Sequence, residues 1–246
     1  MKLNILHLYP DLMSIYGDRG NILALTKRTV WRNIAVNLVE ASIGDRLSLK
    51  DIDLIFFGGG QDKEQVLVCE DLQADKKFIL QEAVESGTVM LGICGGFQLL
   101  GKYYRTGNGK ELPGCDIMQL RTEPGAKRMI GNVILQTSLS GQELVGFENH
   151  SGRTYLSGQT KPLGQVICGF GNNGEDGQEG AVYKNCFGTY LHGPLLPKNP
   201  WFADYLIELA LQRKYGSITL SELDDRIESY AHKQAKAIAE QKSKRC

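Results

Sequence analysis

Several classes of protein are excluded by what this 246-residue chain lacks. Lys plus Arg and Asp plus Glu both number 28, so the net charge is zero and offers no general attraction to nucleic acid or to an anionic membrane surface. No stretch approaches the roughly 18 apolar residues of a membrane span. The apolar run at residues 3–8 is too short for a secretory signal. We therefore expect a cytoplasmic protein whose partners are recognised locally.

Metal and nucleotide motifs are also missing. The six cysteines form no CxxC pair and have no Cys/His spacing that would make a zinc site, so we expect no metal and a reducing compartment. The triple glycine at residues 58–60 is not followed by Lys-Ser/Thr, and no Gly-x-Gly-x-x-Gly follows the first apolar run. ATP binding by this chain is not expected, and we predict no cofactor in it.

The first half of the chain alternates between strand-like and helix-like patterns. Continuous apolar runs such as residues 53–57 are typical of strands buried on both faces of a parallel sheet. Strands are predicted at residues 3–8, 34–39, 53–57 and 88–91, and helices at 19–32 (with Asp18 as N-cap), 62–85 and 95–104. This order predicts an α/β fold with a doubly wound, mostly parallel sheet and a binding crevice at the carboxyl ends of the strands.

The second half has a different texture. Short β-like runs, separated by Gly- and Asn-rich turns, predict either added antiparallel strands or a small β layer over the sheet; they cover residues 128–136, 144–148, 164–170, 181–184 and 187–191. The acidic residues between Gly169 and Gly180 miss the alternating register of a calcium loop, which favours a hairpin or mobile loop. Helices are predicted at about 201–214 and 220–243. We expect residues 1–246 to form one domain.

A possible nucleophile lies where the fourth predicted strand meets a helix. The sequence Gly92-Ile93-Cys94-Gly95-Gly96 provides the small residues that a sharp strand-to-helix turn requires around an exposed reactive group. The following helix directs its positive dipole end at the sulfur, which favours the thiolate. A buried cysteine in a tight turn is the structural alternative. Backbone N–H groups of residues 58–60 and Gly95 are candidate donors to an oxyanion.

A thiol nucleophile needs a base, and the chain contains four histidines. His192 follows a predicted strand and precedes Gly193-Pro194, so it is expected at the same crevice as Cys94. His150 is the rival, although a turn-stabilising role fits it better. We interpret His7, inside the first strand, and His232, on the last helix, as structural or surface residues.

These motifs resemble those of the class I (triad-type) glutamine amidotransferases. Gly92, Cys94, Gly96 and Gln98 meet the Gly-x-Cys-x-Gly-x-Gln pattern of that family. The segment 188–193 is similar to the histidine motif of its cobyric-acid-synthase (CobB/CobQ-like) branch, and the resemblance covers nearly the whole chain. It implies the flavodoxin-like fold of that family.

The resemblance also implies roles for individual residues. Cys94 is the expected nucleophile, His192 the expected general base and acid, and Arg128 the expected holder of the glutamine substrate. A guanidinium can grip an α-carboxylate with two hydrogen bonds, although Arg128 read alone is a surface arginine on a strand. Many members place an acidic residue two positions after the histidine, but residue 194 is proline. Either Cys94 and His192 act as a dyad, or the orienting carboxylate comes from elsewhere, such as a partner subunit.

The similarity extends to glutaminase subunits of lipid II-amidating complexes. It implies L-glutamine hydrolysis and delivery of ammonia to a MurT-like, Mur-ligase-family subunit in a heterodimer. That partner would bind ATP and Mg and amidate the D-glutamate α-carboxylate of lipid II to D-isoglutamine, at the inner face of the membrane. The alternatives are a glutamine amidotransferase for another carboxylate, such as a cobyrinate-like acceptor, a free-standing γ-glutamyl hydrolase, and a non-enzymatic scaffold.

Overall fold

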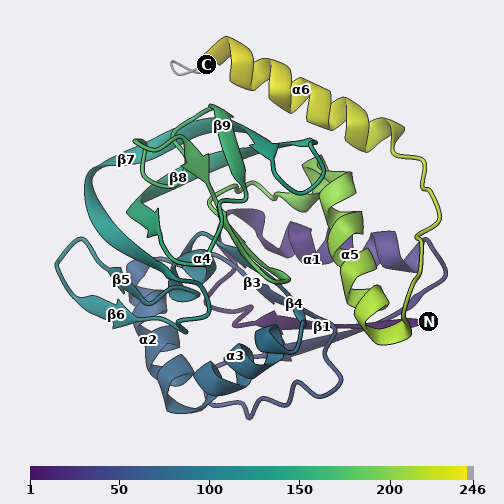
Figure 1. Ribbon diagram of the computed structural model, residues 1–246, viewed down its shortest axis with the longest axis horizontal. Helices are drawn as coiled ribbons and strands as arrows, with labels where there is room; N and C mark the ends of the chain where they lie inside the picture. Colours follow the sequence, from purple (N-terminus) through teal and green to yellow (C-terminus); the bar gives the residue numbers. More distant parts are fainter. Residues whose placement is uncertain (243–246) are drawn as a thin grey trace.

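A computed structural model describes residues 1–242, apart from the side chains of Tyr16 and Lys242. The last predicted helical residue, 243, lies outside this range. Two six-stranded sheets organise the chain, one mostly parallel and one mostly antiparallel (Figure 1). This confirms the predicted α/β class with a mostly parallel sheet.

The parallel sheet has the strand order β11-β12-β4-β3-β1-β2, and only the edge strand β11 is antiparallel to its neighbour. Its strands are β1 (Lys2–Leu8), β2 (Ala35–Ala41), β3 (Leu54–Phe57), β4 (Val89–Ile93), β11 (Ala181–Tyr183) and β12 (Cys186–Thr189). All residues of β3 and β4 are buried, as their unbroken apolar sequences predict. The four strands predicted in the first half are confirmed. Because these strands are parallel, their carboxyl ends all lie at the same edge of the sheet.

Helices cover both faces of this sheet. Figure 1 shows α1 and α5 on one side and α2 and α3 on the other. Their bounds are α1 (Arg19–Val30), α2 (Asp62–Asp71), α3 (Lys77–Glu85) and α5 (Pro200–Tyr215), with a π-helical turn η2 (Leu72–Lys76) and 3-10 turns η1 (Ile15–Gly17) and η3 (Leu196–Lys198). The predicted helix 62–85 is therefore one continuous segment. Asp18 is the N-cap residue of α1, as predicted, but its side chain makes no cap hydrogen bond.

The helix after Cys94 is shorter than predicted. It was expected at 95–104, but α4 (Gly95–Leu99) ends after five residues and β5 (Tyr103–Arg105) follows. The chain reverses because Lys102 N donates to Leu120 O at 2.8 Å. At Gly101 a side chain would meet the Leu120 Cδ1 at 2.1 Å, so the two segments pack too closely for a larger residue.

The second sheet runs in the order β10-β9-β7-β5-β6, with β8 also paired to β7. It is formed by β5, β6 (Glu111–Pro113), β7 (Leu120–Thr137), β8 (Glu143–Leu156), β9 (Gly164–Cys168) and β10 (Gln178–Glu179). The antiparallel β9 and β10 flank the glycine-rich turn, which confirms the predicted hairpin. Both predicted alternatives for the second half of the chain therefore occur. β11 and β12 add strands to the first sheet, and the other strands form a second sheet.

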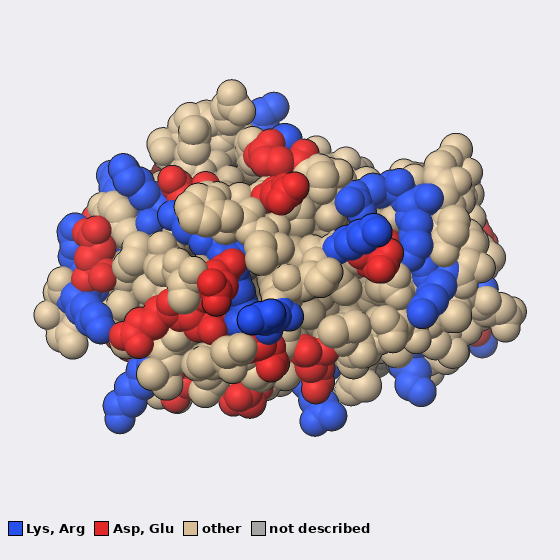
Figure 2. Space-filling view, turned by 90° about the horizontal axis from the view of Figure 1, so that it is seen from below, with Lys and Arg blue, Asp and Glu red and all other residues tan. Residues whose placement is uncertain are grey.

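The last helix, α6 (Arg226–Lys242), begins later than the predicted residue 220. The segment before it is held by Arg28, which forms ion pairs with Asp204 at 2.7 Å and Asp225 at 2.6 Å. From there α6 crosses the second sheet, where Ala239 is buried with Ile134 and Cys168. No helix within residues 1–242 is long and apolar enough to cross a membrane. Acidic and basic side chains are interspersed on the face shown in Figure 2.

Candidate active site

Cys94 occupies a strained turn between β4 and α4. Its φ of 49° and ψ of −102° lie outside the regions that non-glycine residues prefer. Two hydrogen bonds fix the turn, from Cys94 N to Thr189 O at 2.9 Å and from Gly96 N to Gly58 O at 3.0 Å. A Cβ on Gly96 would lie 2.3 Å from the Phe57 carbonyl oxygen, so only glycine fits. The predicted strand-to-helix turn is confirmed.

The turn opens into a cavity of about 530 Å³. The cavity lies at the carboxyl edge of the parallel sheet, where the second sheet meets it. It is lined by Ile15, Gly60, Gln61, Asp62, Lys63, Gln65, Cys94, Gln98, Tyr104, Arg128, Asn149, His150 and Ser151. The structure therefore brings two of the three predicted site residues, Cys94 and Arg128, to one cavity large enough for an amino acid.

The Cys94 sulfur is held as a thiol in the unliganded chain. Burial raises its pKa to about 12, and the carboxylates of Asp18 and Asp62 add to that effect, against the opposing influence of the Gly95 N–H and the Arg128 charge. We predicted that the helix dipole would favour the thiolate. A five-residue helix has a weak dipole, and burial with two nearby carboxylates outweighs it.

His192 lies just beyond the end of β12. This strand is the neighbour of β4, which precedes Cys94. Ile93 of β4 pairs with Thr189 of β12, so both chains leave the sheet at the same edge. His192 N donates to Phe147 O at 2.7 Å, which ties this segment to β8. The imidazole is 1% exposed and lies outside the residues that line the cavity.

Several of the groups that act on His192 are cationic or can become so. Burial, followed by His150, Arg128 and Lys198, lowers its pKa to about 3. The ring is therefore neutral at physiological pH, which is the form that a base requires. The assignment of His192 as that base stays a prediction.

Arg128 projects from β7 beside a break in the strand register between Pro124 and Met129. Its Nε donates to the Asn149 side-chain oxygen at 2.9 Å and its Nη2 to the Asn149 carbonyl at 3.1 Å. These bonds orient the guanidinium at the cavity. Its charge lowers the pKa of both Cys94 and His192, so Arg128 is within electrostatic reach of both.

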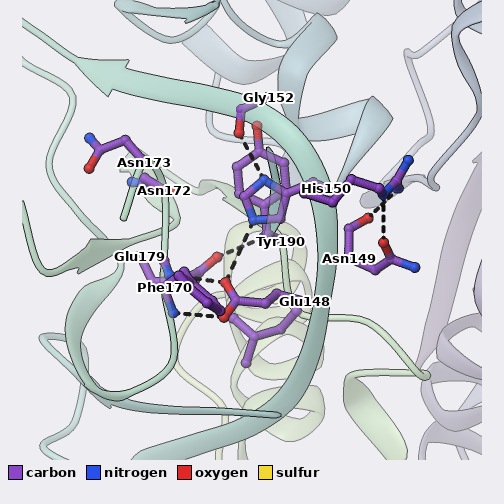
Figure 3. Close-up of polar contacts among 12 residues, drawn as sticks. Glu148, Asn149, His150, Gly152, Phe170, Asn172, Asn173, Glu179 and Tyr190 are labelled. Carbon is purple, nitrogen blue, oxygen red and sulfur yellow. Dashed lines mark hydrogen bonds and ion pairs between the residues drawn. The ribbon is translucent and has the colours of Figure 1, made fainter. Parts of the chain in front are cut away.

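His150 lies within β8 rather than in a turn, so its predicted turn-stabilising role was wrong. Its ring stacks on Tyr190 with centroids 3.5 Å apart, and its Nδ1 is 2.9 Å from the Gly152 carbonyl (Figure 3). On the other edge of the ring, Nε2 lies 3.6 Å from Glu148 Oε2. The alternation of Glu148, His150 and Gly152 along the strand places all three on one face, which is the signal that could have predicted this cluster.

Glu148 in turn anchors the glycine-rich turn. Its two carboxylate oxygens accept hydrogen bonds from Phe170 N at 2.7 Å and Gly171 N at 3.0 Å (Figure 3). The buried Asn172 closes the same turn through hydrogen bonds with both backbone groups of Gly180, each at 2.9 Å. This network gives the wall behind His150 a fixed shape.

Asp18 was not predicted to belong to the site. Its side chain is fully buried, and Oδ2 accepts a hydrogen bond from Gly59 N at 2.7 Å. A methyl group on Gly59 would lie 3.3 Å from that oxygen and 3.4 Å from the Cys94 Cβ, so Asp18 is a close neighbour of the nucleophile. Because Gly59 N is used in this bond, Gly60 and Gly95 are the better candidates for oxyanion donors.

Comparison with known proteins identifies the family of the chain. Residues 4–200 match the family described as the CobB/CobQ-like glutamine amidotransferase domain. The chain belongs to this family of glutamine amidotransferases, which confirms the predicted enzyme class.

Among its relatives are proteins named lipid II isoglutaminyl synthase (glutamine-hydrolyzing) subunit GatD. The one from Staphylococcus aureus (strain N315) is 45% identical over 94% of this chain and 93% of its own length. The one from Streptococcus pneumoniae (strain ATCC BAA-255 / R6) is 44% identical over 87% of this chain and 83% of its own length. The predicted resemblance to lipid II-amidating glutaminase subunits is confirmed.

Solved structures share the fold. A glutamine amidotransferase of Thermotoga maritima aligns with a TM-score of 0.54 and 16% identity over 96% of this chain and 94% of that one. The CTPS glutaminase domain of Trypanosoma brucei aligns with a TM-score of 0.53 and 12% identity over 89% of this chain and 96% of that one. The predicted glutamine amidotransferase fold is confirmed.

Proposed function

We propose that this chain is the glutaminase subunit of a lipid II-amidating complex. It hydrolyses L-glutamine and passes the ammonia to a MurT-like, Mur-ligase-family partner in a heterodimer. The partner binds ATP and Mg and amidates the D-glutamate α-carboxylate of lipid II to D-isoglutamine. High identity to the GatD subunits over most of both chains supports this assignment. The main structural support for glutamine hydrolysis by this chain is the strained Cys94 turn, which opens into the cavity.

The reaction begins when the Cys94 sulfur attacks the side-chain amide carbon of glutamine. The thiol proton passes to His192, whose imidazole is neutral before the reaction. The oxyanion that forms lies near the N–H groups of Gly60 and Gly95. His192 then gives the proton to the departing ammonia, which leaves a γ-glutamyl thioester on Cys94. A water molecule deprotonated by His192 hydrolyses this thioester to glutamate and restores the thiol.

Proline at position 194 is the reason to expect a carboxylate from the partner. Three cationic or potentially cationic groups act on this ring and make its protonated form costly. Residue 194, where many relatives of the class carry an acid, is proline and packs against Gly20. A carboxylate from the partner beside His192 would raise its pKa and fix its orientation. Ammonia release would then depend on assembly of the complex.

We place the protein in the cytoplasm, at the inner face of the membrane where its partner meets lipid II. Four cysteines, Cys69, Cys94, Cys115 and Cys186, are buried free thiols, whereas Cys168 is disulfide-bonded. The placement therefore rests on the nucleophile, whose sulfur must remain reduced to react.

A cobyrinate-like carboxylate is the second candidate for the group that is amidated, because some relatives are named cobyric acid synthases. A probable cobyric acid synthase of Methanothermobacter thermautotrophicus is 34% identical over 78% of this chain, but the match spans only 39% of that protein. The near full-length match to the GatD subunits favours lipid II over a cobyrinate-like acceptor. Purification of the native complex decides between them, because a Mur-ligase-like ATP-dependent subunit should accompany this chain.

Replacement of Cys94 tests the division of labour between the subunits. In the assembled complex, Cys94→Ser should abolish glutamine-dependent amidation of lipid II and leave amidation driven by ammonium chloride intact. The matched control is Cys69→Ser, because the Cys69 thiol donates to Pro113 O at 3.2 Å, outside the cavity, and serine keeps that donor. Mass spectrometry of the stem peptide measures both reactions. Loss of both activities in Cys94→Ser, or retention of the glutamine-dependent one, would contradict the proposal.

A further inference from the structure

Two side chains of opposite charge line the cavity that contains the Cys94 sulfur. Asp62 is the first residue of α2, and Arg128 lies on β7 across the junction of the two sheets. Both are exposed, and both act on Cys94, where the charge of Asp62 raises the pKa of the thiol and that of Arg128 lowers it. The two charges are therefore close enough to the nucleophile to serve one small ligand.

Asp62 is held in place by a buried phenol. Tyr104 is 4% exposed, and its hydroxyl donates to Asp62 Oδ1 at 2.9 Å. Burial and the neighbouring carboxylate raise the pKa of Tyr104, so it remains a donor at physiological pH. This bond occupies one oxygen of Asp62 and leaves Oδ2 for a ligand. A surface carboxylate without such support would move among several rotamers.

Arg128 is oriented in a comparable way. Asn149 accepts hydrogen bonds from Nε and Nη2 of the guanidinium, which leaves Nη1 available. Lys63 adds a second cation to the lining, and Asp62 is the only carboxylate among the lining residues that the structure describes. If a ligand carries one positive and one negative group, Asp62 is therefore the lining side chain that can pair with the positive group.

Free glutamine is such a ligand. Its α-carboxylate and α-ammonium are attached to one carbon, and its amide lies three bonds further along the side chain. When the amide reaches Cys94 at the wall of the cavity, the charged end lies toward the exposed mouth, where Asp62 and Arg128 are found. We propose that Asp62, positioned by Tyr104, binds the α-ammonium group of the glutamine substrate and selects the free amino acid over amides that lack this group. This inference rests on the proposed function.

Asp62 also has a purely structural reading. An acidic residue in the first turn of a helix interacts favourably with the helix dipole, and Asp62 begins α2. In that case its removal would weaken the helix and affect every ligand equally. The two readings therefore differ in whether the effect of substitution depends on the amino group of the ligand.

Binding measurements with a matched ligand pair test this directly. The ligands are L-glutamine and glutaramate, which is glutamine without its α-amino group, and calorimetry is carried out on the complex that contains Cys94→Ser. We expect glutamine to bind about 10- to 100-fold more tightly than glutaramate, as a charge-assisted hydrogen bond predicts. With Asp62→Asn added, the preference should fall to about threefold or less. The affinity for glutaramate should not change.

Two controls separate binding from folding. Glu70→Gln removes a carboxylate from the same helix but outside the cavity lining, and it should leave the preference unchanged. Asn at residue 62 keeps an oxygen that can accept the Tyr104 hydrogen bond. In the enzyme with Cys94 intact, Asp62→Asn should raise the KM for glutamine about 10- to 100-fold with little change in kcat.

The outcomes distinguish this inference from the proposed function. Equal weakening of both ligands by Asp62→Asn, or an unchanged preference, overturns the role of Asp62. Selective binding of glutamine through Asp62, with no ammonia released by the complex that has Cys94 intact, would support this inference and overturn the glutaminase function.

Discussion

Substitution of Asp18 by Asn is expected to change how the stability of the protein depends on pH. The Asp18 carboxyl is fully buried and accepts one hydrogen bond, from Gly59 N, while its Oδ1 has no hydrogen-bond partner. Burial raises its pKa from 3.8 to about 7, partly opposed by that hydrogen bond. In the unfolded chain the same group titrates near its ordinary value.

The sign of the effect follows from the protons bound in each state. Below about pH 4 both states are protonated, and Asp18 has no effect on the pH dependence. As pH rises toward 7 the unfolded chain loses the proton and the native protein retains it, so stability falls. The difference between 3.8 and about 7 corresponds to about 4 kcal/mol lost by neutral pH. Above pH 7 the penalty is constant.

Asn is nearly isosteric, keeps an oxygen for Gly59 N and does not titrate. The stability of Asp18→Asn relative to wild type should therefore rise by about 4 kcal/mol between pH 4 and pH 8. For a chain of this size that is a relative increase in Tm of about 10 °C, measured by scanning calorimetry across the pH range. The control Asp75→Asn removes an exposed carboxylate and should leave the pH dependence unchanged. A Tm difference between Asp18→Asn and wild type that is the same at every pH would refute the reasoning.

Two further predictions concern the C-terminal segment and the partner. Arg28→Met should lower the free energy of unfolding by about 2–3 kcal/mol, because Arg28 is 3% exposed and its loss leaves Asp225 without its ion pair and Asp204 with Arg32 alone. Urea unfolding measures this, and a change below about 1 kcal/mol, similar to that of the exposed control Arg226→Met, would contradict it. The isolated chain should hydrolyse glutamine far more slowly than the complex in an ammonia-release assay, because we propose that the partner supplies the carboxylate that position 194 lacks. Equal rates would remove the reason to invoke that carboxylate.

Much of the parallel sheet could be predicted because its chemistry is local. Residues 54–57 and 89–91 are apolar without interruption, which is typical of a strand buried on both faces. The Cys94 turn was also predictable, since its glycines are next to it in the chain. By contrast, α4 ends early because the distant Leu120 packs against Gly101, and no local pattern records that contact.

The parts of the site that were missed depend on contacts between distant segments. Asp18 has the sequence pattern of a helix cap, but its carboxylate turns to the N–H of Gly59, 41 residues away. The stacking of His150 on Tyr190 and the hydrogen bond from Tyr104 to Asp62 also join separate elements. Even His192 was located by its position after a strand, whereas its buried cationic surroundings come from three other segments of the fold.

The protonated resting state of Cys94 has a consequence for oxidative damage. Peroxide reacts with thiolates far faster than with thiols, and over-oxidation to sulfinic acid is irreversible for most enzymes. A sulfur whose pKa is raised to about 12 is therefore a poor target while the site is idle. The reactive anion forms only during turnover, so idle subunits should outlast working ones when both are exposed to peroxide.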